Sequence, residues 1–188
     1  MKLLIKKYLR DMNSYDLMQI LDVLKSSINN DTKIIVMTND SSFDFNPYEY
    51  YYSHETNIPI MINYKLNEIE WDIVMPIFRP FIATRGFDSI IMELYKEKFP
   101  NLDGVLWFND NIQKDIATFP IIGRKYYEKY GYIFNEIYNK KNFEEEFTDI
   151  LKLNEKYYYE EKVIFKILQL KHDDDNIYEM RKKVNFCL

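Results

Sequence analysis

Residues 2–38 alternate a strand, a helix and a second strand, and this order constrains the fold more than any other feature of the chain. Residues 2–8 predict the first strand. Asn13 or Ser14 is placed to cap a helix that runs to about Ile28, because apolar residues recur along it at helical spacing. Lys33 to Thr38 (KIIVMT) is a β-branched segment typical of a buried strand. The order predicts an α/β fold with a mostly parallel central sheet flanked by helices.

Further short elements follow along the chain. We expect strands at residues 58–62, 71–78, 104–108 and 117–122, and helices at residues 87–99, 124–130 and 144–153. Pro76 indicates an irregular end or a sheet edge for its strand. Residues 157–170 fit a strand followed by a helix, and residues 176–183 fit a helix. The 188 residues contain no low-complexity linker and no repeat, so residues 1–188 predict a single domain.

Charge and cysteine content exclude several classes of function. The net charge is −5 and no basic run is present, which argues against nucleic acid as a partner. Cys187 is the one cysteine, so no internal disulfide can form, and His54 and His172 are too few to complete a zinc site with it. Lys6 and Lys7 interrupt the apolar N-terminus, and no run approaches the ~20 apolar residues of a membrane span. The sequence therefore predicts a cytoplasmic protein without a membrane span.

Three sequence blocks carry the functional signal. They are residues 99–110 (FPNLDGVLWFND), 119–133 (FPIIGRKYYEKYGYI) and 144–149 (EEEFTD). In this order and spacing they resemble GT-A-fold glycosyltransferase-like proteins, related to family 2, of the type found in phages, large viruses and bacteria. The resemblance is loose before residue 71 and good from 71 to 149. It implies a Rossmann-like GT-A fold and transfer of a sugar from a nucleotide-sugar donor to a glycan or protein acceptor.

The resemblance also implies which residues bind the nucleotide. It places Arg10, Asp40 and Asn63 near the carboxyl ends of the first strands, where ligands bind in open α/β sheets. A cation such as Arg10 suits a diphosphate. From the residues alone, an arginine after a strand is equally compatible with an ordinary surface position.

The acidic block suggests the base of an inverting transfer. Such a base is a carboxylate within hydrogen-bond reach of the acceptor hydroxyl. The resemblance places it at the start of the helix that follows residue 143, and we expect Glu145 or Glu146 to fill this role. The alternative is that these acidic residues only decorate the first turn of a helix, where carboxylates are common.

The chain departs from the family at its metal motif. GT-A enzymes usually carry an acidic pair after the strand that begins WDI, and this pair holds Mn²⁺ or Mg²⁺ against the diphosphate. Here the position carries Phe78 and Arg79. Lys166 also stands where a histidine is expected. The sequence therefore leaves Mn²⁺ or Mg²⁺ as an open alternative without evident ligands, and we assign Arg79 to the nucleotide site.

Two interpretations of this departure remain. Either Arg79 replaces the metal electrostatically in a working transferase, or the chain is a catalytically inactive, glycosyltransferase-derived binding or structural module. A pocket that gathers Arg10, Arg79 and Glu145 favours the enzyme. A pocket plugged by Phe78 and Pro80 favours the inactive module.

Overall fold

The computed structural model describes residues 1–9, 21–22, 24–39, 41–42, 44–79, 81–112, 114–138 and 142–167. The strands are β1 (Leu3–Leu9), β2 (Lys33–Thr38), β3 (Glu49–Tyr52), β4 (Ile73–Ile77), β5 (Phe81–Ala83), β6 (Val105–Phe108), β7 (Ile121–Gly123), β8 (Tyr157–Glu160) and β9 (Phe165–Ile167). The helices are α2 (Ile58–Asn63), α3 (Phe87–Lys98), α4 (Arg124–Tyr130) and α5 (Phe143–Asn154). Residues 21–22 and 24–26 are also helical.

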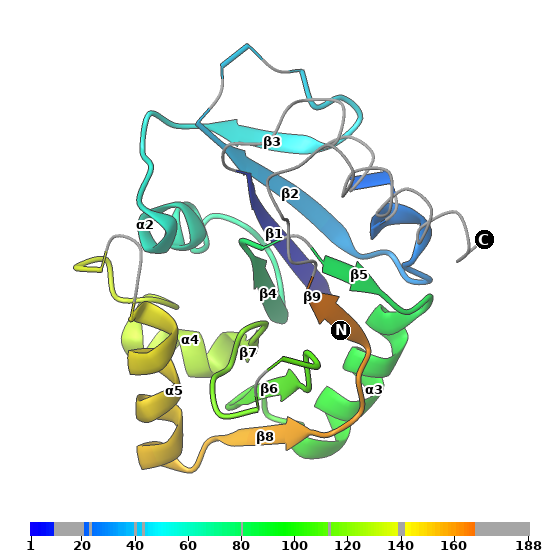
Figure 1. The fold of residues 1–188 in the computed structure, drawn as a ribbon, viewed down its shortest axis with the longest axis vertical. Coiled ribbons are helices and arrows are strands. Elements are labelled where there is room, and N and C mark those ends of the chain that lie inside the picture. The colour runs from blue at the N-terminus through cyan, green and yellow to red at the C-terminus, as the bar shows by residue number, and fades with distance from the viewer. Residues whose placement is uncertain are drawn as a thin grey trace.

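A seven-stranded sheet forms the centre of the molecule, in the order β3-β2-β1-β4-β7-β6-β8 (Figure 1). Strands β3, β2, β1 and β4 pair in parallel, and β6 pairs in parallel with β8. Strand β7 runs antiparallel to both of its neighbours, β4 and β6. The predicted α/β fold with a mostly parallel sheet is therefore confirmed.

Helices cover both faces of this sheet and create two apolar layers. Strand β1 is buried along its whole length, and its successive residues alternate between the layers. Leu3 and Ile5 pack with α3 and with residues 21–24 on one face. Leu4 packs with α2, α4 and α5 on the other. Figure 1 shows α2, α4 and α5 together on one side and α3 on the opposite side.

A second, two-stranded sheet pairs β5 with β9 in antiparallel register. Its anchor is Phe165, whose ring contacts those of Phe81, Phe87, Phe108 and Phe119 at centroid distances of 5.5 to 5.8 Å. Such tilted and edge-to-face pairs are the favoured arrangement of buried aromatic rings. This cluster holds the small sheet against the α3 face of the large one.

The prediction of a strand at residues 58–62 is wrong, because this segment forms helix α2. Asn57 caps the helix with its side chain, which accepts a hydrogen bond from the amide of Ile60 at 3.2 Å. Pro59 stands at the start of the helix, where its missing N–H costs nothing. A short apolar run cannot be assigned by periodicity alone, and here the capping residues decide the outcome.

Pro76 does not mark a sheet edge, since β4 lies between β1 and β7. Strand β7 pairs only with Ile73 and Val74, so no strand faces Pro76 on that side. The proline therefore lies in a central strand without breaking a ladder, contrary to the usual rule.

Other boundaries also differ from expectation. The expected strand 117–122 shortens to β7, β3 was not foreseen, and the segment after residue 164 begins as strand β9 instead of a helix. The expected helix at 176–183 and the proposed cap at Asn13 or Ser14 lie outside the described residues. In the part of the chain that is described, no helix is both long and apolar enough to cross a bilayer.

Candidate functional site

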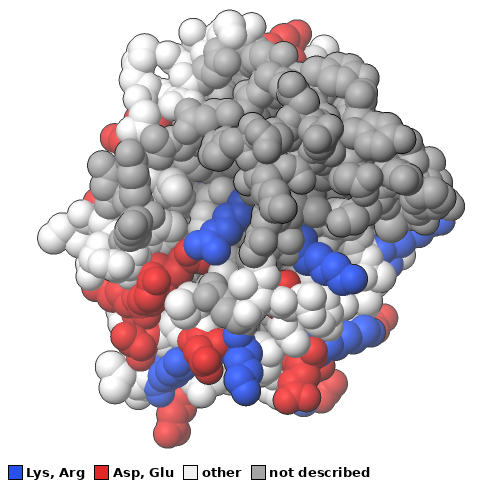
Figure 2. Space-filling model, viewed as in Figure 1, with Lys and Arg blue, Asp and Glu red and all other residues white. Residues whose placement is uncertain are grey.

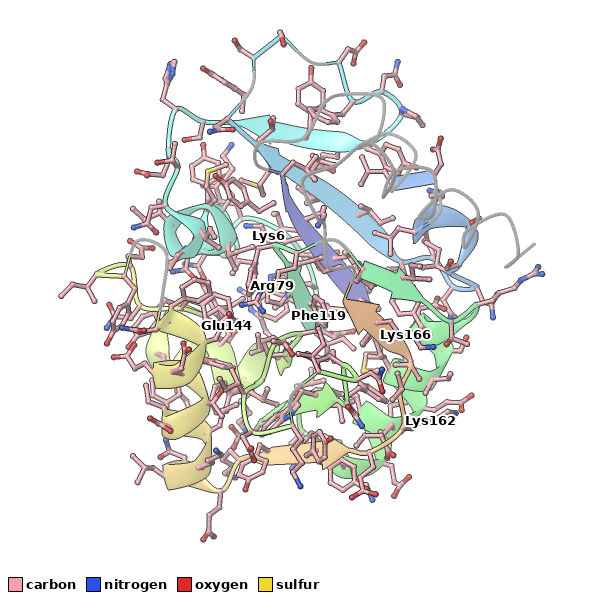
Figure 3. All side chains as sticks on the ribbon, in the orientation of Figure 1. Lys6, Arg79, Phe119, Glu144, Lys162 and Lys166 are labelled. Carbon is pink, nitrogen blue, oxygen red and sulfur yellow. The ribbon has the colours of Figure 1, made fainter. Side chains whose placement is uncertain are left out.

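The candidate site lies at the carboxyl ends of the parallel strands, where β4 has just ended and α5 begins. Arg79 follows β4 by two residues, and its Nη2 donates a hydrogen bond to Oε2 of Glu144, in the first turn of α5. The Arg79 side chain is 38% exposed, whereas that of Glu144 is 8% exposed. Figure 3 shows the two side chains meeting in front of the sheet. The cation of this ion pair is therefore partly exposed to solvent, whereas its carboxylate is buried.

Packing and hydrogen bonds fix the start of α5 at this place. Phe143 and Phe147 are buried in the layer shared with α2 and α4. Thr148 donates to the carbonyl oxygen of Glu144 at 2.6 Å and accepts from the amide of Ala117 at 3.0 Å. Next to Ala117, Thr118 donates to Oδ2 of the buried Asp110 at 2.6 Å. These bonds bring the end of the first sequence block and all of the third to one edge of the sheet.

The environment of Glu144 makes its carboxyl unusual. The pKa of Glu144 is raised to about 7, mainly by burial; the charge of Arg79 lowers it, and the charges of Glu145 and Asp110 add to the rise. Its Oε1 is buried and has no hydrogen-bond partner in the described part of the chain. A carboxyl with a pKa near neutrality can exchange a proton at physiological pH, as a general base must.

Two consecutive lysines of β1, Lys6 and Lys7, are buried next to the site and point to opposite faces of the sheet. Lys7 donates to the carbonyl oxygen of Arg79 at 2.9 Å, which fixes the backbone of the arginine. Lys6 points to the other face and donates to the carbonyl oxygens of Met61, Ile62 and Tyr64. Burial lowers the pKa of both lysines to about 7.

The residues assigned to the site from sequence have different fates. Arg79 occupies the site, whereas Arg10 and Asp40 lie outside the described residues. Glu145 is exposed, and Glu146 is half-buried, with Oε1 accepting from Asn135 at 3.4 Å. The roles of these residues stay predictions, with Glu144 in place of its neighbours as the partner of Arg79.

Asn63 has a full set of partners in this structure. Its Nδ2 donates to the carbonyl oxygen of Phe134 at 2.8 Å and to Glu136 at 3.0 Å. Its Oδ1 accepts from the amides of Ile133 at 2.8 Å and Phe134 at 3.4 Å. These bonds tie the end of α2 to the segment after α4. A nucleotide contact by Asn63 stays a prediction, and it would require exchanging one of these bonds.

Phe78 packs into the wall beside the site, and the guanidinium carbon of Arg79 lies over its ring, 5.5 Å from the ring centroid. Its ring contacts Phe134 and Phe143 edge-on at 5.9 and 5.2 Å. The second residue expected to form a plug, Pro80, lies outside the described residues. Phe78 therefore contributes to the apolar layer under α5, next to the guanidinium.

Sequence reasoning did not single out Lys7 or Glu144. The signal for Lys7 was present, because two consecutive lysines inside a seven-residue buried strand require partners at both faces. Glu144 gave no such signal, since it stands in a run of three glutamates and only the packing of α5 separates them. Within the described ranges, no three His, Cys, Asp or Glu side chains gather closely enough to hold a metal ion.

Comparison of the whole structure with solved structures identifies the architecture. The structure of S. aureus TarS, a GT-A glycosyltransferase, superposes with a TM-score of 0.66 at 13% identity, covering 99% of this chain and 39% of TarS. TarS 1–349 in complex with UDP-GlcNAc gives a TM-score of 0.66 at 12% identity, covering 100% of this chain and 66% of that one. The chain has a GT-A-like fold.

A second kind of nucleotide-sugar enzyme has the same architecture. CMP:2-keto-3-deoxy-manno-octonic acid synthetase in complex with CTP matches with a TM-score of 0.58 at 10% identity, with both chains covered completely. No protein-family model matches the chain, and no curated protein matches it. The GT-A-like chain spans less than two thirds of the TarS structures, so these likenesses define its fold and leave its activity to the site residues.

Proposed function

We propose that this chain binds a nucleotide sugar at the carboxyl ends of β1 and β4 and transfers the sugar to a glycan or protein acceptor. The observation that carries the proposal is the Arg79–Glu144 pair, which places a cation and a carboxyl with a pKa of about 7 at this edge. Ligands of open α/β sheets bind at this edge. The GT-A-like fold supports the choice of a nucleotide sugar.

The two charges suit the two ends of a transfer reaction. In an inverting transfer, the acceptor oxygen bonds to the anomeric carbon as its proton passes to a carboxylate, and the bond to the diphosphate breaks. Negative charge then grows on the departing diphosphate, which a guanidinium stabilises. The carboxyl of Glu144 has the pKa that suits a base, while Glu145 is the more exposed carboxylate and Glu146 the third candidate.

A donor screen with three single variants tests this function. The protein is incubated with UDP-, GDP- and CMP-linked sugars, and release of the nucleotide is followed with and without simple glycan acceptors. One donor should be consumed, and one of Glu144→Gln, Glu145→Gln and Glu146→Gln should lose about 10²- to 10⁴-fold in rate, as loss of a general base does. Consumption of no donor, or equal rates in all three variants, would refute the assignment.

An inactive binding module is the second candidate. The observation that favours it is Arg79 itself, which stands where the resemblance places an acidic metal pair. A module of this kind binds a nucleotide or a nucleotide sugar and stabilises the native state by mass action, without consuming the ligand. A rise in Tm with one ligand, together with no nucleotide release over many hours, would select this candidate.

A further inference from the structure

The site does not fit the divalent ion that a GT-A fold usually carries. Mn²⁺ and Mg²⁺ require several oxygen ligands, with carboxylates among them. Residues 1–9, 21–22, 24–39, 41–42, 44–79, 81–112, 114–138 and 142–167 contain no group of three such ligands. The Oε2 atom of Glu144 accepts a hydrogen bond from Arg79, the residue at the expected metal position. A guanidinium at this position repels a second cation.

Arg79 has hydrogen-bonding capacity to spare. A guanidinium has five N–H donors in a planar fork. The bond from Nη2 to Glu144 uses one of them, and the remaining donors have no acceptor among the described residues. Since the side chain is 38% exposed, these donors are open to an anion from solvent.

Lys7 adds a second cation under the same turn. Its side chain is buried, with the residue only 2% exposed, and among the described residues its ammonium has the carbonyl oxygen of Arg79 as acceptor. An ammonium has three donors, so two remain without a described partner. The lysine therefore positions Arg79 and places a positive charge behind it.

The surrounding face carries charges of both signs. Figure 2 shows Lys and Arg side chains around the middle of this face, with Asp and Glu side chains beside them. In Figure 3, Lys162 and Lys166 lie on the other side of Phe119 from Arg79. Both lysines are exposed. These two lysines therefore add cations to the face on which Arg79 lies, among acidic residues.

We propose that this site binds the diphosphate of a nucleotide directly through Arg79, supported by Lys7, with no divalent ion. The inference rests on the nucleotide site of the proposed function and departs from the metal-bridged diphosphate that the fold implies. Arg79 supplies the forked donors that match phosphate oxygens. Lys7 acts as a positioning residue, because it holds the backbone of Arg79 while its charge adds to the field.

Calorimetric titration tests the inference directly. UDP, GDP, CDP and inorganic pyrophosphate are titrated into the full chain, once with EDTA and once with Mn²⁺. We expect one nucleoside diphosphate to bind with EDTA, with an affinity that Mn²⁺ changes by less than about threefold, since a bridging ion is worth far more than this. Binding that requires Mn²⁺ overturns the inference and leaves the proposed function standing. Binding of none of these ligands under either condition overturns both.

Variants locate the binding to Arg79. Arg79→Gln should lower the affinity for the nucleoside diphosphate at least tenfold, and Arg79→Lys should recover part of it as a point charge without the fork. Arg79→Gln leaves the buried Glu144 without its ion-pair partner. The double variant Arg79→Gln/Glu144→Gln is therefore measured as well, with its fold verified by circular dichroism. Lys2→Gln makes the same change of charge at the opposite edge of the sheet, where Lys2 forms an exposed ion pair with Glu70. Wild-type affinity in the double variant, or an equal loss in Lys2→Gln, would overturn the inference.

Discussion

Lys6 and Lys7 are neighbours in one strand and are equally buried, yet their surroundings differ. Burial lowers the pKa of each to about 7. Lys6 Nζ has three carbonyl acceptors, including those of Ile62 at 2.7 Å and Met61 at 3.4 Å. Lys7 Nζ has one described acceptor, the carbonyl oxygen of Arg79. Among the described residues, the ammonium on one face of β1 therefore has an acceptor for every donor, whereas the ammonium on the other face has one acceptor.

The difference separates a structural cation from a site cation. Lys6 closes the end of α2, whose last carbonyls have no partner within the helix. All three of its donors are used there, so nothing remains for a ligand. Lys7 lies two residues before the carboxyl end of β1, toward the edge where ligands bind, and two of its donors have no partner among the described residues. A buried charge is costly, so an incomplete set of partners points to an interaction with a ligand.

Replacement of Lys6 should give the largest effect on stability. Lys6→Met keeps much of the side-chain volume but leaves three buried or half-buried carbonyls unpaired, at about 1–3 kcal/mol for each group, and removal of the buried ammonium offsets part of this loss. We expect a loss of about 4 kcal/mol in the free energy of unfolding, measured by urea denaturation. If the variant is as stable as the wild type, the carbonyls have other partners and the structural role of Lys6 is wrong.

Glu144→Gln should give the next largest effect, visible in the dependence of stability on pH. The pKa of Glu144 is raised from 4.5 to about 7 on folding, so the folded state binds the proton more tightly. Stability from this group is complete below pH 4.5 and is lost as pH rises through 7, by about 3 kcal/mol at most. Relative to wild type, Glu144→Gln should therefore gain stability from pH 5 to 7.5.

The matched control for this measurement is Glu145→Gln, the exposed neighbour in the same helical turn. Its difference from wild type should stay nearly constant over the same pH range, because an exposed side chain keeps its hydration on folding. The two Tm profiles together isolate the buried carboxyl. Parallel profiles for Glu144→Gln and wild type would contradict the raised pKa and weaken the case for Glu144 as a base.

Much of the fold follows from local signals in the sequence. Strand β2 and helix α4 have the predicted bounds, and the end of α4 is marked by Gly131 in the left-handed conformation at a φ of 76°. Such a glycine is a common helix terminator. Helix α2 was mistaken for a strand because a six-residue apolar run has too few turns to show its period. Strand β3 was missed because three of its four residues are exposed.

The site was less accessible from sequence than the fold. Arg79 was assigned to the site because it stands where the resemblance expects an acidic pair, and its role stays a prediction. The choice among Glu144, Glu145 and Glu146 depends on which face of α5 packs against Phe134. Phe143 and Phe147 make this contact, and they lie 9 and 13 residues from Phe134 in the chain. No local pattern encodes that orientation when three identical residues are consecutive. Tertiary packing therefore determines which carboxyl meets the arginine.

Replacement of Lys7 should have the smallest effect on stability and the clearest effect on binding. Lys7→Met removes one hydrogen bond, worth about 1 kcal/mol, and also removes the cost of a buried ammonium. Because burial lowers the folded pKa of Lys7 to about 7, below its usual 10.5, this cost is fully present below pH 7 and fades as pH rises to 10.5. We expect Lys7→Met to be no less stable than wild type at pH 7 by urea denaturation, and to bind the nucleoside diphosphate about tenfold more weakly. Lys6→Met should then lower the free energy of unfolding, whereas Lys7→Met should lower the affinity for the nucleoside diphosphate. A Lys7→Met variant with wild-type affinity would make both lysines structural and remove the distinction between the two faces of β1.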